Sequence, residues 1–208
     1  MNAAEQLRPR WRKAWRCVSG GSDPGVYAEL LARYAEPHRA WHNLDHVAGC
    51  LRDLDVARSL LARPAEAELA VWFHNAIYDP RRNDNEAQSA ALVEAALRAA
   101  GVGEETARRV GDLVRATAHR APPYGDAAVV CDIDLAILGA EPDAFARYDA
   151  AIQQEYDWVP ADVYRRERAN VLSGFLERPV IYHTAFFHDR LETAARGNLR
   201  QAVAYYSV

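Results

Sequence analysis

Three side chains that could bind a metal ion stand out in the sequence. His46 follows a candidate helix cap, His74 lies inside a long apolar run, and Asp134 interrupts a second apolar run. A buried polar side chain that is left unpaired costs about 1–3 kcal/mol, so each of them needs a partner. Imidazole and carboxylate ligands suit divalent ions such as Mn, Fe, Zn and Co. Such an ion activates bound water and polarises a phosphoryl oxygen, which is the chemistry of phosphate-ester hydrolysis.

The apolar run around His74 predicts a buried helix. Residues 69–79 are apolar on nearly all sides of a helix, and His74 and Asn75 are the polar pair in the middle. Pro64 suits the first turn of this helix, and Asp79 with the proline after it favours a turn at its end. The polar pair therefore needs either hydrogen-bond partners or a metal.

The other two candidate ligands are also predicted to lie on helices. Asn43 is a suitable N-cap for a helix that runs to about residue 62 and has His46 in its first turn. The run 127–139 contains Asp132 and Asp134; by its period it could be a strand, but its helical surroundings favour a helix. Hydrophobic spacing predicts further helices at residues 3–17, 25–35, 84–100, 104–118, 142–156, 160–177 and 189–204. We expect an all-α chain with one domain over residues 1–208.

Composition narrows the class of protein. Of the 208 residues 50% are hydrophobic and 26% are charged, as in ordinary soluble domains, and no stretch reaches the ~20 apolar residues that span a bilayer. The net charge of −4 argues against broad electrostatic binding of nucleic acid or anionic membranes. The three cysteines are widely spaced and form no metal or redox motif, and residues 1–17 do not resemble a signal peptide. We therefore expect a cytoplasmic protein with reduced thiols.

Several motifs together resemble one protein family. The run 72–79, with His46 upstream and Asp134 downstream, resembles the HD-domain superfamily of helical proteins, which is named for a metal-binding His-Asp doublet. More closely, residues 7–205 are similar to a group of bacterial proteins described as predicted metal-dependent HD phosphohydrolases. The segments that carry this similarity are 41–47, 72–79, 84–86, 116–119 and 134–139.

The resemblance implies an HD-fold helical bundle and a metal site. His46, His74 and Asp134 would be ligands of a divalent ion, which could be Mn, Fe, Zn, Co or Mg. The remaining ligand position falls on Asn75, where the family has Asp. Asn keeps the shape and one carbonyl oxygen but lacks the negative charge, so we expect metal binding to weaken. Three explanations stay open: an engineered inactive variant, a natural enzyme that binds metal weakly, or a family member without catalysis.

Further polar residues are candidates for the same site. The resemblance allows His42 and His119 as additional ligands or substrate contacts, although His119 could merely stabilise the C-terminus of a helix. Asp132 could hold a ligand histidine in one tautomer. Asp79 or Asp134 could accept the proton of the attacking water. The arginines that could bind a phosphate in bidentate fashion are Arg39, Arg81 and Arg82.

These observations predict a metal-dependent phosphohydrolase that acts on a small phosphate ester such as a nucleotide. Two alternatives stay open. Asn75 is compatible with a metal-poor binding or regulatory module, and His42 with His119 would be needed as ligands in a di-iron oxygenase of the HD type. No residue pattern identifies the base or sugar of a substrate, and none indicates an oligomeric state.

Overall fold

The computed structural model describes residues 3–207, and this range contains ten α-helices and no β-strand. The all-α class predicted from the sequence is therefore confirmed. The chain separates into two compact units, residues 1–131 and residues 132–208, and the single domain expected from the sequence stays a prediction. In the described range, none of the helices has the length and apolar character needed to cross a membrane.

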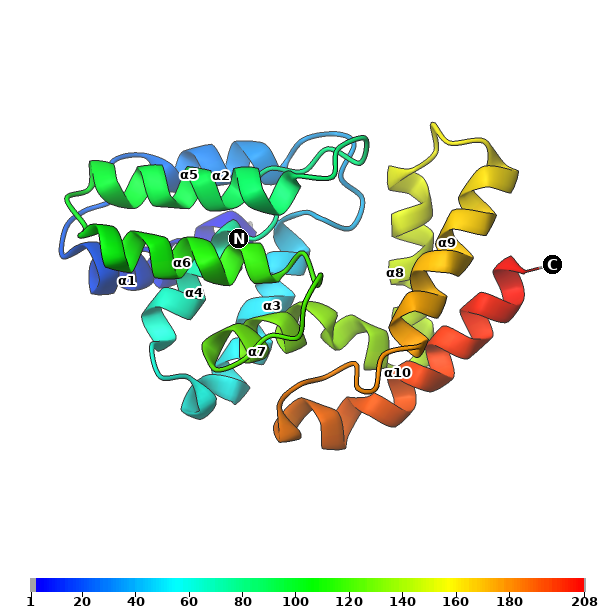
Figure 1. Cartoon of the computed structure of the whole chain (residues 1–208). Coiled ribbons are helices and arrows are strands. Elements are labelled where there is room, and N and C mark those ends of the chain that lie inside the picture. Colours follow the sequence, from blue (N-terminus) through cyan, green and yellow to red (C-terminus); the bar gives the residue numbers. More distant parts are fainter. Residues whose placement is uncertain (1–2, 208) are drawn as a thin grey trace. The chain divides into compact units, whose positions relative to one another are not determined.

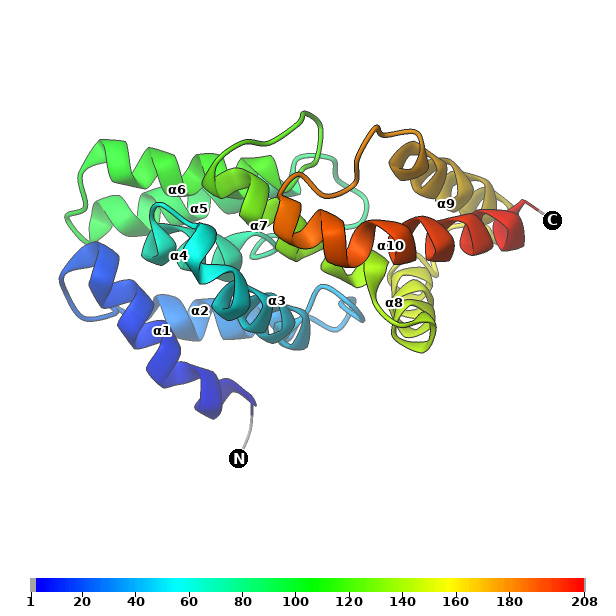
Figure 2. The ribbon, with the colours of Figure 1, turned by 90° about the horizontal axis from the view of Figure 1, so that it is seen from below.

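The first unit is built around α4 (Pro64–Phe73), and every residue of α4 from Ala67 onward is buried. Burial on all sides explains why this helix has no polar face, and the predicted buried helix is confirmed up to Phe73. Four helices of the unit pack most extensively against it (Figure 1, Figure 2): α1 (Ala3–Ser19), α3 (Leu44–Ala57), α5 (Asn85–Ala99) and α6 (Glu104–Ala116). The unit also contains α2 (Val26–Tyr34) and the beginning of α7 (Asp126–Asp134).

Aromatic side chains fix α4 against α1 and α2. Trp11 and Trp15 of α1 are fully buried and stack with ring centroids 5.4 Å apart. The ring of Trp11 also meets Trp72 of α4 edge to face at 5.4 Å, and Tyr27 of α2 meets Trp72 at 5.9 Å. Such aromatic pairs contribute about 0.5–1.5 kcal/mol beyond their burial. The cluster therefore holds the end of α4, directly before His74, in a defined position.

The helix α4 ends at Phe73, whereas the sequence pattern extends it to residue 79. Beyond Phe73 the backbone finds its hydrogen bonds on side chains of α5. The amide of Ile77 donates to Oγ of Ser89 at 2.9 Å, and Asn85 accepts from the amide of Asp79 at 3.1 Å. Side-chain bonds of this kind compete with helical ones. The His-Asn pair therefore lies in a turn after the helix, and its predicted place inside the helix is wrong.

The helix α3 begins as predicted. The Oδ1 atom of Asn43 accepts hydrogen bonds from the amides of Asp45 at 2.9 Å and His46 at 3.3 Å. This cap satisfies two amides that have no partner within the helix and places His46 in the first turn. The α-helix ends at Ala57 instead of residue 62, and a 3₁₀ turn (Arg58–Leu60) follows it.

The second unit contains three helices after the end of α7: α8 (Pro142–Glu155), α9 (Ala161–Leu176) and α10 (Ala185–Tyr206). Residues 135–139 form a 3₁₀ turn, so the run 127–139 is helical, as its surroundings favoured. The carboxylate of Asp132 accepts the amides of His183 at 2.8 Å and Thr184 at 2.7 Å. Thr184 then caps α10, which begins before the predicted residue 189 because this cap satisfies its first turn.

Candidate metal centre

Three potential metal ligands gather in the first unit. His46 lies in the first turn of α3, Cys50 follows one turn later, and His74 comes directly after α4. Nε2 of His46 lies 3.0 Å from Nε2 of His74, and Sγ of Cys50 lies 3.6 Å from Nε2 of His46. Each side chain offers one ligand atom within 4.8 Å of those of the other two. Because positions i and i+4 share a helix face, α3 presents His46 and Cys50 side by side.

The surroundings of His74 decide which of its nitrogens can bind a metal. Its Nδ1 lies 2.8 Å from the carbonyl oxygen of Val71 in the last turn of α4. Because a carbonyl oxygen only accepts, Nδ1 carries the proton, and Nε2 of the neutral ring keeps its lone pair. A carbonyl on the second ring nitrogen is a common support of metal-binding imidazoles. Nε2 of His74 therefore directs its lone pair towards Nε2 of His46, 3.0 Å away.

The three side chains are shielded from solvent. The exposed fractions of the residues are 7% for His46, 4% for Cys50 and 2% for His74. The ring of Trp41 lies beside that of His46, with centroids 5.2 Å apart. Buried polar groups require partners, and two imidazole nitrogens with a thiol form a donor set that suits zinc and similar ions. This cluster could hold a divalent metal ion.

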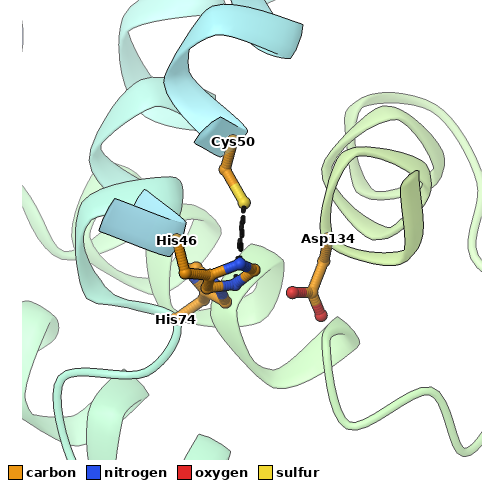
Figure 3. Close-up of side chains that lie close together, drawn as sticks. All are labelled: His46, Cys50, His74 and Asp134. Carbon is orange, nitrogen blue, oxygen red and sulfur yellow. Dashed lines mark hydrogen bonds between the residues drawn. The ribbon is translucent and has the colours of Figure 1, made fainter. Parts of the chain in front are cut away.

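Figure 3 draws these side chains together with Asp134, the carboxylate that the sequence predicts as a ligand. Asp134 is the last residue of α7 and is half-buried. The helix begins in the first unit, but Asp134 itself belongs to the second unit. A carboxylate would add a hard, negatively charged ligand to the imidazoles and the thiol. The role of Asp134 as a metal ligand stays a prediction.

Asn75 lies in the turn after α4 and is half-buried. Its backbone carbonyl accepts a hydrogen bond of 2.6 Å from Nη1 of Arg39. The neutral amide side chain brings no negative charge to the neighbourhood of His74. Among the described residues of the first unit, the clustered ligands are two imidazoles and the thiol of Cys50. The thiol is therefore the member of this trio that can become an anion.

Arg39 holds the chain segments around the cluster together. Its side chain is fully buried, and it donates to the carbonyl oxygens of His42 at 2.9 Å, Asn75 at 2.6 Å and Ala76 at 3.1 Å. Its Nε also donates to Glu36 at 2.9 Å. These bonds tie the segment before α3 to the turn after α4. The guanidinium is used inside the protein, and the predicted phosphate contact of Arg39 stays a prediction.

Two further histidines stay outside the cluster. The ring of His42 stacks on Tyr78 at 4.1 Å, and its centroid lies 6.1 Å from that of His46. His119 follows α6 with a φ of 52°, a left-handed conformation that is uncommon for residues other than glycine. Within residues 3–207 neither histidine belongs to the group of potential metal ligands. The di-iron alternative, which needs both as ligands, gains no support from this arrangement.

Three residues of the loop after α4 were predicted to take part in the reaction. Oδ1 of Asp79 accepts the backbone amide of Arg81 at 2.9 Å, which shapes the turn. Arg82 forms an exposed ion pair with Asp84 at 2.7 Å. Proton transfer by Asp79 and phosphate contacts by Arg81 and Arg82 stay predictions.

Asp132 has a structural role in the second unit. Burial raises the pKa of its carboxyl group above the ordinary range, and the hydrogen bonds from His183 and Thr184 oppose this rise. These bonds join the end of α7 to the start of α10. The tautomer of His74 is set by the carbonyl of Val71 instead. The predicted role of Asp132 in orienting a ligand histidine stays a prediction.

Cys50 is a potential ligand that the sequence reasoning missed. The three cysteines lie far apart in the sequence, so their spacing from one another gives no metal motif. The available signal was the spacing from His46 to Cys50, four residues on a predicted helix, which places both on one face.

No family model, no curated protein and no solved structure matches the chain. The cluster therefore rests on its own geometry. The likeness to HD proteins rests on the motif residues, of which His46 and His74 meet in the first unit.

Proposed function

We propose that the chain is a metal-dependent phosphohydrolase of the HD type, with His46 and His74 as metal ligands. The observation that carries this proposal is the 3.0 Å approach of their Nε2 atoms in a buried cluster. Two imidazole nitrogens at this distance need a shared proton or a cation between them. The carbonyl oxygen of Val71 already accepts a hydrogen bond from Nδ1 of His74. Metal-binding imidazoles are commonly supported in this way at their second ring nitrogen. The HD motifs of the sequence support the same chemistry.

A bound divalent ion lowers the pKa of a bound water and polarises a phosphoryl oxygen of the substrate. The chain contributes the geometry: the Asn43 cap fixes the start of α3, and Arg39 ties that segment to the turn after α4. In this proposal Asp134 supplies a carboxylate ligand, and Asp79 or Asp134 accepts the proton of the attacking water. Arg81 contacts the phosphate of a small ester such as a nucleotide.

The test compares two histidine variants of the full chain. His74→Gln removes a buried ligand, whereas His188→Gln changes a histidine of the second unit whose side chain is 44% exposed, and serves as the control. We expect the wild type and the control to retain a divalent metal and to hydrolyse at least one member of a phosphoester panel. We expect His74→Gln to lose metal affinity by about 100-fold or more, since even supporting residues are worth 10–100-fold. Equal metal content of the two variants, measured by elemental analysis, would contradict the proposal.

Asn75 favours a second candidate function, a binding or regulatory module without turnover. The side-chain amide of Asn75 lacks the negative charge of the Asp in the HD doublet. We therefore expect a lower affinity for a hard divalent ion in this chain. Asn75→Asp separates the two functions in the same assays. Hydrolysis by the wild type, or hydrolysis restored by Asn75→Asp, supports an enzyme scaffold. Metal binding by Asn75→Asp without any turnover of the panel supports the binding module.

A further inference from the structure

We propose that Cys50 binds the metal as a thiolate and that the centre is consequently a zinc site. This inference rests on the metal centre of the proposed function and deepens it by naming a further protein ligand beside His46 and His74, and the ion. It uses only His46, Cys50 and His74, which all belong to the first unit.

The distances between the three side chains fit zinc ligands. Zinc lies about 2.0–2.1 Å from an imidazole nitrogen and about 2.3 Å from a cysteine sulfur. At a tetrahedral angle, one nitrogen and one sulfur bound to the same zinc are therefore about 3.6 Å apart, and two nitrogens about 3.3 Å apart. Sγ of Cys50 lies 3.6 Å from Nε2 of His46, and the two Nε2 atoms lie 3.0 Å apart. These two distances thus need adjustments of at most a few tenths of an ångström. The ligand atoms of Cys50 and His74 lie within 4.8 Å of each other.

The surroundings of Cys50 differ from those of the other buried cysteine. The thiol of Cys131 is 1% exposed and donates to the backbone carbonyl of Ala116 at 3.3 Å. The sulfur of Cys50 instead faces the ring of His46, 3.6 Å from Nε2 and 3.8 Å from Nδ1 (Figure 3). Cys131 therefore has an ordinary structural partner, whereas Cys50 lies among potential metal ligands.

Charge gives a reason for a thiolate at this position. Asn75 occupies the place at which the HD doublet has a carboxylate, so this position brings no negative charge. A dication in a buried site is stabilised by an anionic ligand. On binding, the Cys50 thiol releases its proton to solvent, and the sulfur lone pair forms the bond to zinc without any oxidation or reduction. The thiolate thereby restores one negative charge beside the two histidines.

The chemical consequence is a change in ion preference. Thiolate ligands favour zinc and similar soft or borderline ions, whereas Mg²⁺ and Mn²⁺ favour oxygen ligands. Three protein ligands with water or substrate in the fourth position are typical of catalytic zinc sites. A centre with two imidazoles and one thiolate therefore combines strong zinc binding with room for chemistry.

Cobalt substitution tests the sulfur ligand directly. The full-length protein is stripped of metal and loaded with Co²⁺, and the near-ultraviolet absorption of the thiolate-to-cobalt charge transfer is recorded. We expect this band in the wild type and in the controls Cys17→Ser and Cys131→Ser, and its loss in Cys50→Ser. A wild type without the band, or a Cys50→Ser variant that keeps it, would overturn the inference.

Zinc affinity gives a second measure on the same variants. Competition with a chelator should show that Cys50→Ser weakens Zn²⁺ binding by about 100-fold or more, beyond the 10–100-fold effect of supporting residues. Mg²⁺ binding should change far less. Equal zinc affinity of Cys50→Ser and Cys131→Ser would overturn the inference.

X-ray absorption of the zinc-loaded wild type avoids any folding defect of a variant. We expect a sulfur neighbour at about 2.3 Å from zinc, and a shell with only nitrogen and oxygen would contradict it. None of these readouts depends on catalysis. A sulfur ligand without phosphoester hydrolysis would therefore uphold this inference and count against the hydrolase, and hydrolysis without a sulfur ligand would do the reverse.

Discussion

At the scale of single residues, Arg39 fixes the backbone beside both His46 and His74. Its guanidinium lies 5.3 Å from the ring centroid of Tyr34 and 5.5 Å from that of Tyr78, between the carbonyls it binds. The planar fork of arginine reaches several acceptors at once, whereas lysine offers one compact ammonium group. The carbonyls of His42 and Asn75, which share Nη1 of Arg39, would lose this partner in a lysine variant.

We therefore expect Arg39→Lys to destabilise the protein by about 2–4 kcal/mol, since each unsatisfied buried acceptor costs about 1–3 kcal/mol. Arg33→Lys is the matched control, because Arg33 forms an exposed i,i+4 pair with Glu29 at 2.8 Å. Such pairs contribute about 0.3–0.5 kcal/mol. Urea unfolding of both variants measures the difference. Equal losses for the two would show that the buried hydrogen bonds of Arg39 add nothing to stability.

The residues of the cluster differ in how far the sequence could predict them. His46 and His74 could be found locally, because one follows a helix cap and the other interrupts an apolar run. Their meeting across 28 positions in the sequence depends on how α3 packs against α4. The hydrogen bonds of Arg39 could not be predicted from the sequence. Their acceptors are backbone carbonyls that become neighbours of Arg39 only after folding.

At the scale of helices, the second unit contains a close approach between the 3₁₀ turn and α10. A Cβ atom added at Gly139 would lie 2.6 Å from Cβ of Leu191 and 2.8 Å from its backbone oxygen. Because a backbone oxygen cannot turn away, the two elements would have to separate. Glycine at this position therefore permits α10 to pack against the turn.

We expect Gly139→Ala to destabilise the protein by about 1–3 kcal/mol through overpacking. Gly197→Ala on α10 is the control, because nothing lies within 4 Å of the added Cβ. There alanine should stabilise the helix by about 0.5–1 kcal/mol, since glycine loses more backbone entropy on folding. Thermal unfolding should show shifts of opposite sign. A Gly139→Ala variant as stable as the wild type would contradict the close packing.

The beginnings of α3 and α4 were easier to predict than their ends. Asn43 and Pro64 carry the chemistry of a helix start in their own side chains, and the structure places both as predicted. The end of α4 depends instead on Ser89 and Asn85 of another helix, which bind the backbone after Phe73. Hydrophobic spacing within the segment contains no information about such distant partners.

At the scale of the whole molecule, the two units contain different kinds of polar group. His46, Cys50 and His74 lie in the first unit, and a buried polar network lies in the second. Arg168 pairs with Asp149 at 2.8 Å, and the hydroxyl of Tyr206 donates to the same carboxylate at 2.6 Å. Tyr164 packs edge to face against Tyr206, with centroids 5.9 Å apart. The network joins α8, α9 and α10. Because its tyrosines have raised pKa values in the folded chain, the free energy of unfolding is expected to fall at alkaline pH.

Burial raises the pKa of Tyr164 to about 12, and burial together with the carboxylate of Asp149 raises that of Tyr206 as well. In the unfolded chain a tyrosine ionises near pH 10, so the native state holds protons that the unfolded state has lost. The stabilising contribution of Tyr164 is therefore complete below about pH 10 and is lost as pH rises towards 12.

Tyr164→Phe removes this titrating group. We therefore expect the free energy of unfolding to fall less steeply between about pH 10 and 12. The slope should decrease by up to about 1.4 kcal/mol per pH unit, which corresponds to one proton. Tyr124→Phe, at a tyrosine that is 89% exposed, should leave the slope of the wild type unchanged. Urea midpoints measured across this range decide the matter. If stability falls equally steeply with pH in both variants, Tyr164 has the same pKa in the folded and unfolded chains. The network would then not shield its hydroxyl from water.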